Sequence, residues 1–219
     1  MCNFPKQLTR EIFRSLPKKL LRNGRLFNAI VYLVEKDGKL WTVKDFSRRP
    51  WYVRWSVVPF LLRHEVKILQ QLPAIKGIAE HVFFIDRNAI AIEFIPGKSI
   101  GQCSAKEIPV SFLLELEDLI RTMHKNYVVH LDLRGGGNVL ITPEQHPALI
   151  DFQSGVSTKK LPNWLRKLLE DMDLSGVYKK WAKYHPREMG ENRKIELARI
   201  NRWRKFWIFR GYFGIKKKS

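Results

Sequence analysis

The chain has 219 residues, 45% of them hydrophobic, which is enough apolar surface for the core of one domain or of two packed lobes. Its 40 Lys and Arg against 21 Asp and Glu give a formal net charge of +19 at pH 7, which favours anionic partners: nucleic acid, an anionic membrane surface or phosphorylated substrates. Two cysteines exclude a disulfide framework, and without a signal-peptide pattern or an apolar run of ~18–20 residues a cytoplasmic protein that does not span a bilayer is expected.

The first half of the chain is predicted to form a small antiparallel sheet with one helix. β-branched and aromatic runs predict four strands, at 29–34, 40–46, 81–86 and 89–95. Asp37-Gly38, between the first two, is typical of a hairpin turn. After a basic and aromatic connection at Ser47–Trp55, the spacing of apolar residues predicts a helix from about Pro59 to Leu72, ended by Pro73.

The second half is predicted to be mainly helical. Helical spacing covers 109–125, short strands at 139–141 and 148–150 enclose a turn, and further helices are expected near 163–172, 174–184 and 187–209. These elements divide the chain into four parts: a basic N-terminal segment (1–25), a sheet lobe (26–97), a mainly helical lobe (98–190), and a basic, aromatic C-terminal helix and tail (191–219).

The residues that indicate a reaction follow the predicted helix at 109–125. Here the chain reads Tyr127-Val-Val-His130-Leu-Asp132-Leu-Arg-Gly-Gly-Gly137-Asn138, and Ile150-Asp151-Phe152 comes after the next two strands. A carboxylate such as Asp132 suits the attacking hydroxyl of a phosphoryl transfer, while Asn138 and Asp151 are hard oxygen ligands for Mg²⁺. His130 is expected to brace this loop. The pattern therefore predicts magnesium-assisted phosphoryl transfer.

In this order, the motifs resemble those of the protein-kinase-like superfamily, especially its short atypical members, the RIO-type kinases and the bacterial lipopolysaccharide-core sugar kinases. The resemblance extends from about residue 29 to about residue 155. It implies an α+β, two-lobed protein-kinase-like fold, in which a small antiparallel sheet lobe with one helix precedes a mainly helical C-terminal lobe. It also implies ATP and Mg²⁺ as cofactors, Asp132 as the base that accepts the hydroxyl proton, and Asn138 and Asp151 as the metal ligands.

The same resemblance implies the residues that hold the nucleotide. Trp41-Thr42-Val43-Lys44 is similar to the strand motif whose lysine contacts the α- and β-phosphates, and Glu65 is the expected partner of Lys44. Ile92-Glu93-Phe94-Ile95 resembles the hinge between the lobes. The contacts to adenine are then expected from Thr42 above the base, from the Glu93 carbonyl and the Ile95 amide at its edge, and from Leu140 below it.

The chain also departs from the kinase pattern. No glycine-rich loop precedes Lys44, so backbone amides or Arg25 are expected to cover the phosphates. Asn138 follows Asp132 by one position more than is usual in protein kinases, an extension that the glycines at 135–137 can absorb. No Ala-Pro-Glu motif follows Asp151, so a long activation segment with its peptide-docking platform is not expected.

The predicted function is ATP-dependent transfer of the γ-phosphate to an acceptor hydroxyl, with a lipid-linked sugar of the lipopolysaccharide-core type, or a related small molecule, as the preferred acceptor. A RIO-like serine/threonine protein kinase, with a protein acceptor, is the alternative. Two further alternatives are a nucleotide-binding pseudokinase scaffold and an RNA- or ribosome-associated protein that binds through its +19 charge.

Two aromatic and basic segments each leave two interpretations open. In 191–219, helical spacing places apolar and aromatic residues on one face and Lys and Arg on the other, so this segment either packs on the helical lobe or lies on anionic lipid at the inner face of a membrane. Trp51, Tyr52 and Trp55 either pack between strand and helix or stack on sugars or bases.

Overall fold

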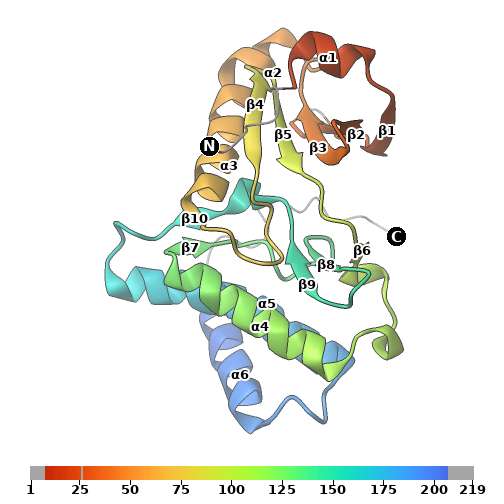
Figure 1. Cartoon of the computed structure of the whole chain (residues 1–219). Helices are drawn as coiled ribbons and strands as arrows, with labels where there is room; N and C mark the ends of the chain where they lie inside the picture. Colours follow the sequence, from red (N-terminus) through yellow and green to blue (C-terminus); the bar gives the residue numbers. More distant parts are fainter. Residues whose placement is uncertain (1–7, 26, 207–219) are drawn as a thin grey trace.

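The first half of the chain forms a five-stranded antiparallel sheet within the described residues, in the order β1-β2-β3-β5-β4 (Figure 1). The computed structural model describes residues 8–25 and 27–206. The strands are β1 (Lys18–Arg22), β2 (Ile30–Lys36), β3 (Lys39–Asp45), β4 (Val82–Asp86) and β5 (Ala89–Glu93). Strand β1 was not predicted, and a lobe boundary at residue 26 would separate it from the sheet to which it is hydrogen-bonded.

The turn between β2 and β3 has the geometry that its sequence predicts. Asp37 and Gly38 both have positive φ, 53° and 72°, as the tight hairpin turn requires. This turn fixes the register, and strand alternation then sorts the side chains of β3. Trp41 and Val43 lie in a small apolar cluster on one face, so the neighbouring Lys44 lies on the other face.

The sheet lobe contains two short helices besides the predicted one in the part that the structure describes. Helix α1 (Arg10–Ser15) buries Phe13 in the small apolar cluster, and its Arg10 binds Asp86 at 2.6 Å and Asp45 at 3.1 Å. Helix α2 (Trp51–Ser56) lies within the expected connection and leads into the predicted helix, α3 (Val58–Gln71). Helix α3 ends before Pro73, as expected.

The second half is built on two long helices, α4 (Val110–Lys125) and α5 (Asn163–Tyr184). Short strands form two small sheets above these helices in Figure 1: β6 (Lys98–Ser99), β8 (Val139–Ile141) and β9 (Pro147–Leu149) in one, and β7 (Val128–Val129) and β10 (Val156–Ser157) in the other. The predicted break near residue 173 is wrong, because α5 is continuous. Three short 3₁₀ turns, η1 (Ile100–Gln102), η2 (Ala105–Glu107) and η3 (Phe152–Ser154), complete this half.

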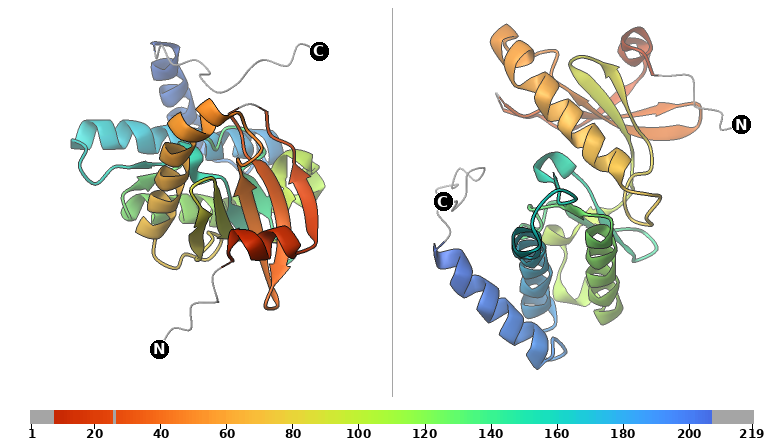
Figure 2. Two further views of the ribbon diagram at one scale, coloured as in Figure 1. Left: turned by 90° about the horizontal axis from the view of Figure 1, so that it is seen from above. Right: turned by 90° about the vertical axis from the view of Figure 1, so that its left-hand side faces the viewer.

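Helix α6 (Glu191–Phe206) follows and packs against α5 (Figure 2). Its Ile200 is buried, Arg199 binds Asp171 at 2.7 Å, and Arg193 binds Glu117 on α4 at 2.7 Å. Helix α6 therefore packs on the helical lobe through these residues, while Trp203 near its end stays exposed, and residues 207–219 lie outside the described part of the chain.

One apolar core joins the two lobes. It runs from α3 and the inner face of the sheet through Phe152 and Leu133 to α4 and α5. The result is the predicted α+β, two-lobed arrangement, with the sheet lobe above and the helical lobe below in Figure 1. In residues 8–25 and 27–206 no helix combines the length and apolar character that crossing a bilayer demands.

Candidate functional site

Lys44 lies at the centre of the site, between the two lobes. Its Nζ is 2.6 Å from Glu65 Oε1 on α3 and 2.6 Å from Asp151 Oδ1 in the segment after β9. Glu65 is buried, so the pair fixes α3 against the sheet, and Asp151 brings the helical lobe to the same ammonium group. Glu65 and Asp151, which follow Lys44 by 21 and 107 positions in sequence, thus meet at the same ammonium group.

The charges in this cluster set the protonation of its members. Burial by itself lowers the pKa of Lys44, but the carboxylates of Glu65 and Asp151 outweigh burial and raise it. The positive charge of Lys44 holds the pKa of Asp151 below its usual range. Burial raises the pKa of Glu65, against the attraction of Lys44. The lysine is therefore a fixed cation, and Asp151 is an anion at neutral pH.

Asp132 and Asn138 lie side by side despite the extra residue between them. Asn138 Nδ2 donates hydrogen bonds to the Asp132 carboxylate, at 2.8 Å from Oδ2, and to the Asp132 carbonyl, at 3.1 Å. The backbone amide of Ile150 donates to the carbonyl of Asn138 at 3.1 Å, which places Asn138 beside the residue that precedes Asp151. The glycine-extended loop therefore brings Asn138 back to Asp132 and next to the strand that leads to Asp151.

Helix α5 anchors the start of this loop through Asp173, which was not among the predicted site residues. The two carboxylate oxygens of Asp173 accept hydrogen bonds from the amides of His130 and Leu131, each at 2.7 Å. His124 Nε2 lies 3.2 Å from the same carboxylate. Leu131 has a left-handed φ of 62°, a conformation that costs energy for a non-glycine residue, and the buried carboxylate compensates for it.

The same face of α5 also holds the middle of the loop. Gly176 lies so close to it that a Cβ atom would be 2.9 Å from the carbonyl carbon of Leu133. One turn further along, buried Lys180 donates hydrogen bonds to the carbonyls of Leu133 and Gly135, the latter at 3.0 Å. Burial, together with the nearby charges of Lys179, Arg134 and Lys183, lowers the pKa of Lys180 to about 8, while Asp132 opposes this effect.

His130 and Phe152 connect the loop to the segment that carries Asp151. The His130 ring is fully buried, lies 4.7 Å from the Phe152 ring, and has its Nε2 at 3.0 Å from the carbonyl of Ile150. On the other side, His64 of α3 lies 2.6 Å from the carbonyl of Gly155. His130 is thus a bracing residue, as predicted, and Asp151 keeps its left-handed φ of 66° between these contacts.

The residues expected around adenine come from the sheet lobe, the linker and the helical lobe. Thr42 lies on the same face of β3 as Lys44, and Leu140 lies on β8 with its neighbours Val139 and Ile141 in the core, so Leu140 faces the opposite way. The side chain of Glu93 accepts hydrogen bonds from the amides of Glu80 and His81, and its own amide donates to the carbonyl of His81 at 2.9 Å, so the expected contact with a base falls to the Glu93 carbonyl. Ile95 follows Glu93 in the linker to the helical lobe.

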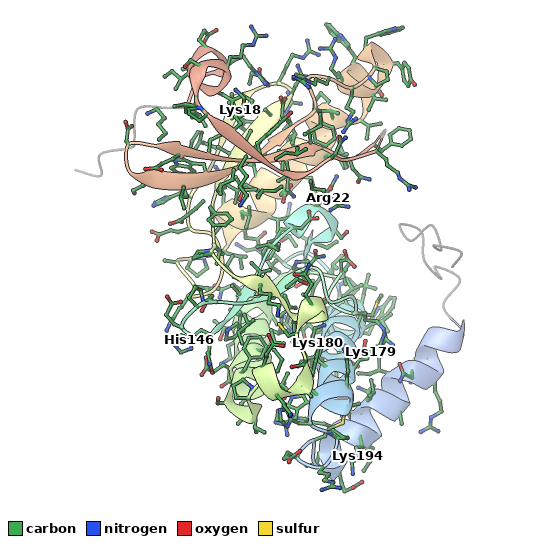
Figure 3. All side chains as sticks on the ribbon, turned by 90° about the vertical axis from the view of Figure 1, so that its right-hand side faces the viewer. Lys18, Arg22, His146, Lys179, Lys180 and Lys194 are labelled. Atoms are coloured by element: carbon green, nitrogen blue, oxygen red, sulfur yellow. The ribbon has the colours of Figure 1, made fainter. Side chains whose placement is uncertain are left out.

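A further cation approaches the site from β1. Figure 3 shows Arg22 at the lower edge of the sheet lobe, facing the helical lobe, and its charge contributes to the lowered pKa of Asp151. Arg22 was not predicted, because β1 was not assigned to the sheet. It supplies positive charge to the surroundings of Asp151 from the sheet lobe.

The donor atoms present suit Mg²⁺. Asp151 is anionic, and because the Asn138 amide nitrogen faces Asp132, its amide oxygen is free for another partner. Two oxygen donors from the protein suffice for an ion that also binds phosphate oxygens and water. These residues fit such a site by their chemistry, and their role as ligands remains a prediction.

A comparison with protein families gave a match that covers most of the chain. A family model described as RIO domain matches residues 37–193, more than two thirds of the chain. The matched range includes Lys44, Glu65, Asp132, Asn138 and Asp151. Comparison with curated proteins gave no match.

Proposed function

Because the chain belongs to the RIO-domain family of kinase-like proteins, which carry out ATP-dependent phosphotransfer, we propose that it transfers the γ-phosphate of ATP to an acceptor hydroxyl. The observation that carries the proposal is the single cluster in which Lys44 bridges Glu65 and Asp151 while Asn138 fixes Asp132. Positioning and electrostatics supply most of the catalysis in phosphoryl transfer, so a rigid set of charges is what the reaction needs.

Each residue has a defined task in this mechanism. Lys44, held by Glu65, binds the phosphates and neutralises their charge. Asp132 orients the acceptor hydroxyl and accepts its proton as the oxygen bonds to the γ-phosphorus and ADP departs. Asn138 and Asp151 would hold Mg²⁺, which lowers the charge repulsion between the phosphates and the incoming oxygen.

The proposed acceptor is a hydroxyl of a sugar, lipid-linked or free, or of a related small molecule. The supporting observation is the short connection between Asp151 and α5. Strand β10 in this connection pairs with β7, and α5 already begins at Asn163. This leaves little chain for the segment on which peptide substrates dock in larger kinases. A serine or threonine of a protein is the second candidate, favoured by the RIO-domain match.

The proposal is tested with two substitutions and one control. Asp132→Ala should abolish transfer while Mg·ATP binding, measured by calorimetry, persists. Asp151→Ala should weaken Mg·ATP binding itself. Asp118→Ala, at an exposed acidic residue of α4, should change neither property. A purified chain without Mg-dependent ATP binding would refute the kinase assignment and favour an RNA-associated role, and binding without transfer to any sugar or protein acceptor would favour the scaffold.

A further inference from the structure

Four large aromatic side chains lie exposed on consecutive turns of α2 and α3. Trp51 is 69% exposed, Tyr52 50%, Trp55 64% and Phe60 70%, whereas Val53 is the buried residue of α2. These aromatic residues therefore do not pack between strand and helix, which was one of the two interpretations of this segment. Contiguous apolar patches of this kind are uncommon on soluble proteins and mark interaction surfaces.

The surroundings of these rings are positively charged. Arg63 lies on α3 one turn after Phe60, and the guanidinium group of Arg87 lies 3.8 Å over the Trp55 ring. Residues 46–64 contain no Asp or Glu. Asp45, just before this segment, and Asp86, just before Arg87, are both bound to Arg10. We call the exposed set the aromatic–basic patch: Trp51, Tyr52, Trp55, Phe60, Arg63 and Arg87.

We propose that the aromatic–basic patch docks this protein on an anionic membrane surface. Trp and Tyr rings favour the headgroup level of a bilayer, and Arg side chains attract anionic lipid. The charge of the patch and of the whole chain, +19, complements such a surface. The proposal concerns a contact surface and does not depend on the phosphotransfer reaction.

The arrangement of the rings favours lipid over single-stranded nucleic acid. Base stacking needs open ring faces. In the patch, Arg87 covers one face of Trp55, Trp51 meets Tyr52 edge to face at 6.1 Å, and Phe60 stacks on the ring of His64 at 6.0 Å. Each ring therefore already contacts a neighbouring side chain, and the edges that stay exposed suit insertion among lipid headgroups.

A second exposed aromatic–basic pair extends the same side of the molecule. Trp203 and Arg202 lie exposed near the end of α6, and Trp203 is 64% exposed. Both views in Figure 2 place the start of the α2–α3 segment and the end of α6 toward one side. The start of α2 and the end of α6, one on each lobe, lie toward this common side, and each carries an exposed Trp. Docking through both would hold the two lobes against one plane.

The experiment is sedimentation of the full chain with lipid vesicles of two compositions, phosphatidylcholine alone and phosphatidylcholine with about one third phosphatidylglycerol. The wild-type chain should bind the anionic vesicles. The double variant Trp51→Ala/Trp55→Ala should bind them at least ten-fold more weakly, equivalent to about 1.4 kcal/mol. Trp164→Ala, which removes a 70% exposed tryptophan from α5, is the matched control and should bind as the wild type does.

Two results would overturn the proposal. One is equal binding of the double variant and the wild type to anionic vesicles, which would place the contact elsewhere, for example in the basic residues of 207–219. The other is failure of the wild type to bind vesicles while it binds a single-stranded uridine oligomer through Trp51 and Trp55, which would identify a nucleic-acid surface. A charge-reversed variant, Arg63→Glu/Arg87→Glu, should lose binding to the anionic vesicles, and retention there would contradict the electrostatic part.

Discussion

Replacing Lys180 with methionine tests how α5 supports the loop at 130–138. The substitution removes a buried ammonium group and leaves a side chain of similar length. Two effects on stability oppose each other. The carbonyls of Leu133 and Gly135 lose a donor, at roughly 1–3 kcal/mol each, whereas relief of charge burial stabilises the variant.

The second effect follows from the pKa of Lys180. Burial lowers it from the ordinary 10.5 to about 8, a difference that corresponds to roughly 3 kcal/mol. Between pH 8 and pH 10.5 the unfolded chain binds the proton and the folded chain releases it, so the free energy of unfolding rises with pH in that window. Below pH 8 the penalty of the buried charge is fully present. At pH 7 the gain and the loss therefore nearly cancel in Lys180→Met.

Urea unfolding at pH 7 and pH 10 measures this balance. The stability of the wild type relative to Lys180→Met should rise by about 2 kcal/mol between the two pH values. Lys160→Met, at an exposed lysine whose charge is not among those that lower the pKa of Lys180, should show no such change. A pH-independent difference between Lys180→Met and the wild type would refute the reasoning about the buried charge.

Lys180→Met should lose activity at pH 7 even though its stability there is nearly unchanged. Without the Lys180 contacts the loop at 133–137 is less fixed, and misplacement of Asp132 by about 1 Å costs on the order of 100-fold in rate. Phosphate release from ATP, with water as the acceptor, should fall in kcat by ten-fold or more, while the KM for ATP stays within about two-fold because Lys44 and the hinge are untouched. Equal kcat values for Lys180→Met and Lys160→Met would show that the loop does not depend on this contact.

Three further substitutions probe the supports of the site. Gly176→Ala places a Cβ atom 2.9 Å from the carbonyl carbon of Leu133. It should lower kcat about ten-fold and the melting temperature by a few degrees, both measured against the wild type. Asp173→Asn removes a buried charge that accepts two amide hydrogen bonds and should cost about 3 kcal/mol in urea unfolding. Lys44→Met leaves the Glu65 carboxylate buried without its cation, so ATP affinity measured by calorimetry should fall at least ten-fold, and unchanged affinity would contradict the phosphate role.

The sequence carried enough information to predict most of the sheet and the central ion cluster. Asp37-Gly38 specifies a turn by local geometry alone, and strand alternation then determines which residues of β3 face inward. Once Lys44 faces inward from the sheet and Glu65 lies on the helix that follows, their contact is nearly determined. The nucleotide and metal contacts of these residues stay predictions.

What the sequence did not reveal depends on contacts between distant segments. Asp173 and Lys180 are ordinary charged residues of a long helix, and their importance follows from packing against a loop more than forty positions earlier. The break predicted near residue 173 followed from polar residues that interrupt the apolar pattern of α5, yet those residues are buried against the loop. Strand β1 was missed because its residues are exposed and carry no alternating pattern.

The position of Asn138 shows why such tertiary contacts matter to the chemistry. A loop with one extra residue, rich in glycine, has many conformations available in isolation, and in most of them Asn138 does not meet Asp132. Asp173 accepts hydrogen bonds from amides at the start of the loop, and Lys180 donates to carbonyls further along it, so one helix face selects a single path for the backbone. With both points fixed, the remaining glycines need only close the distance to Asn138. The extension of the loop is therefore compatible with phosphoryl transfer because α5 supplies the order that the loop sequence lacks.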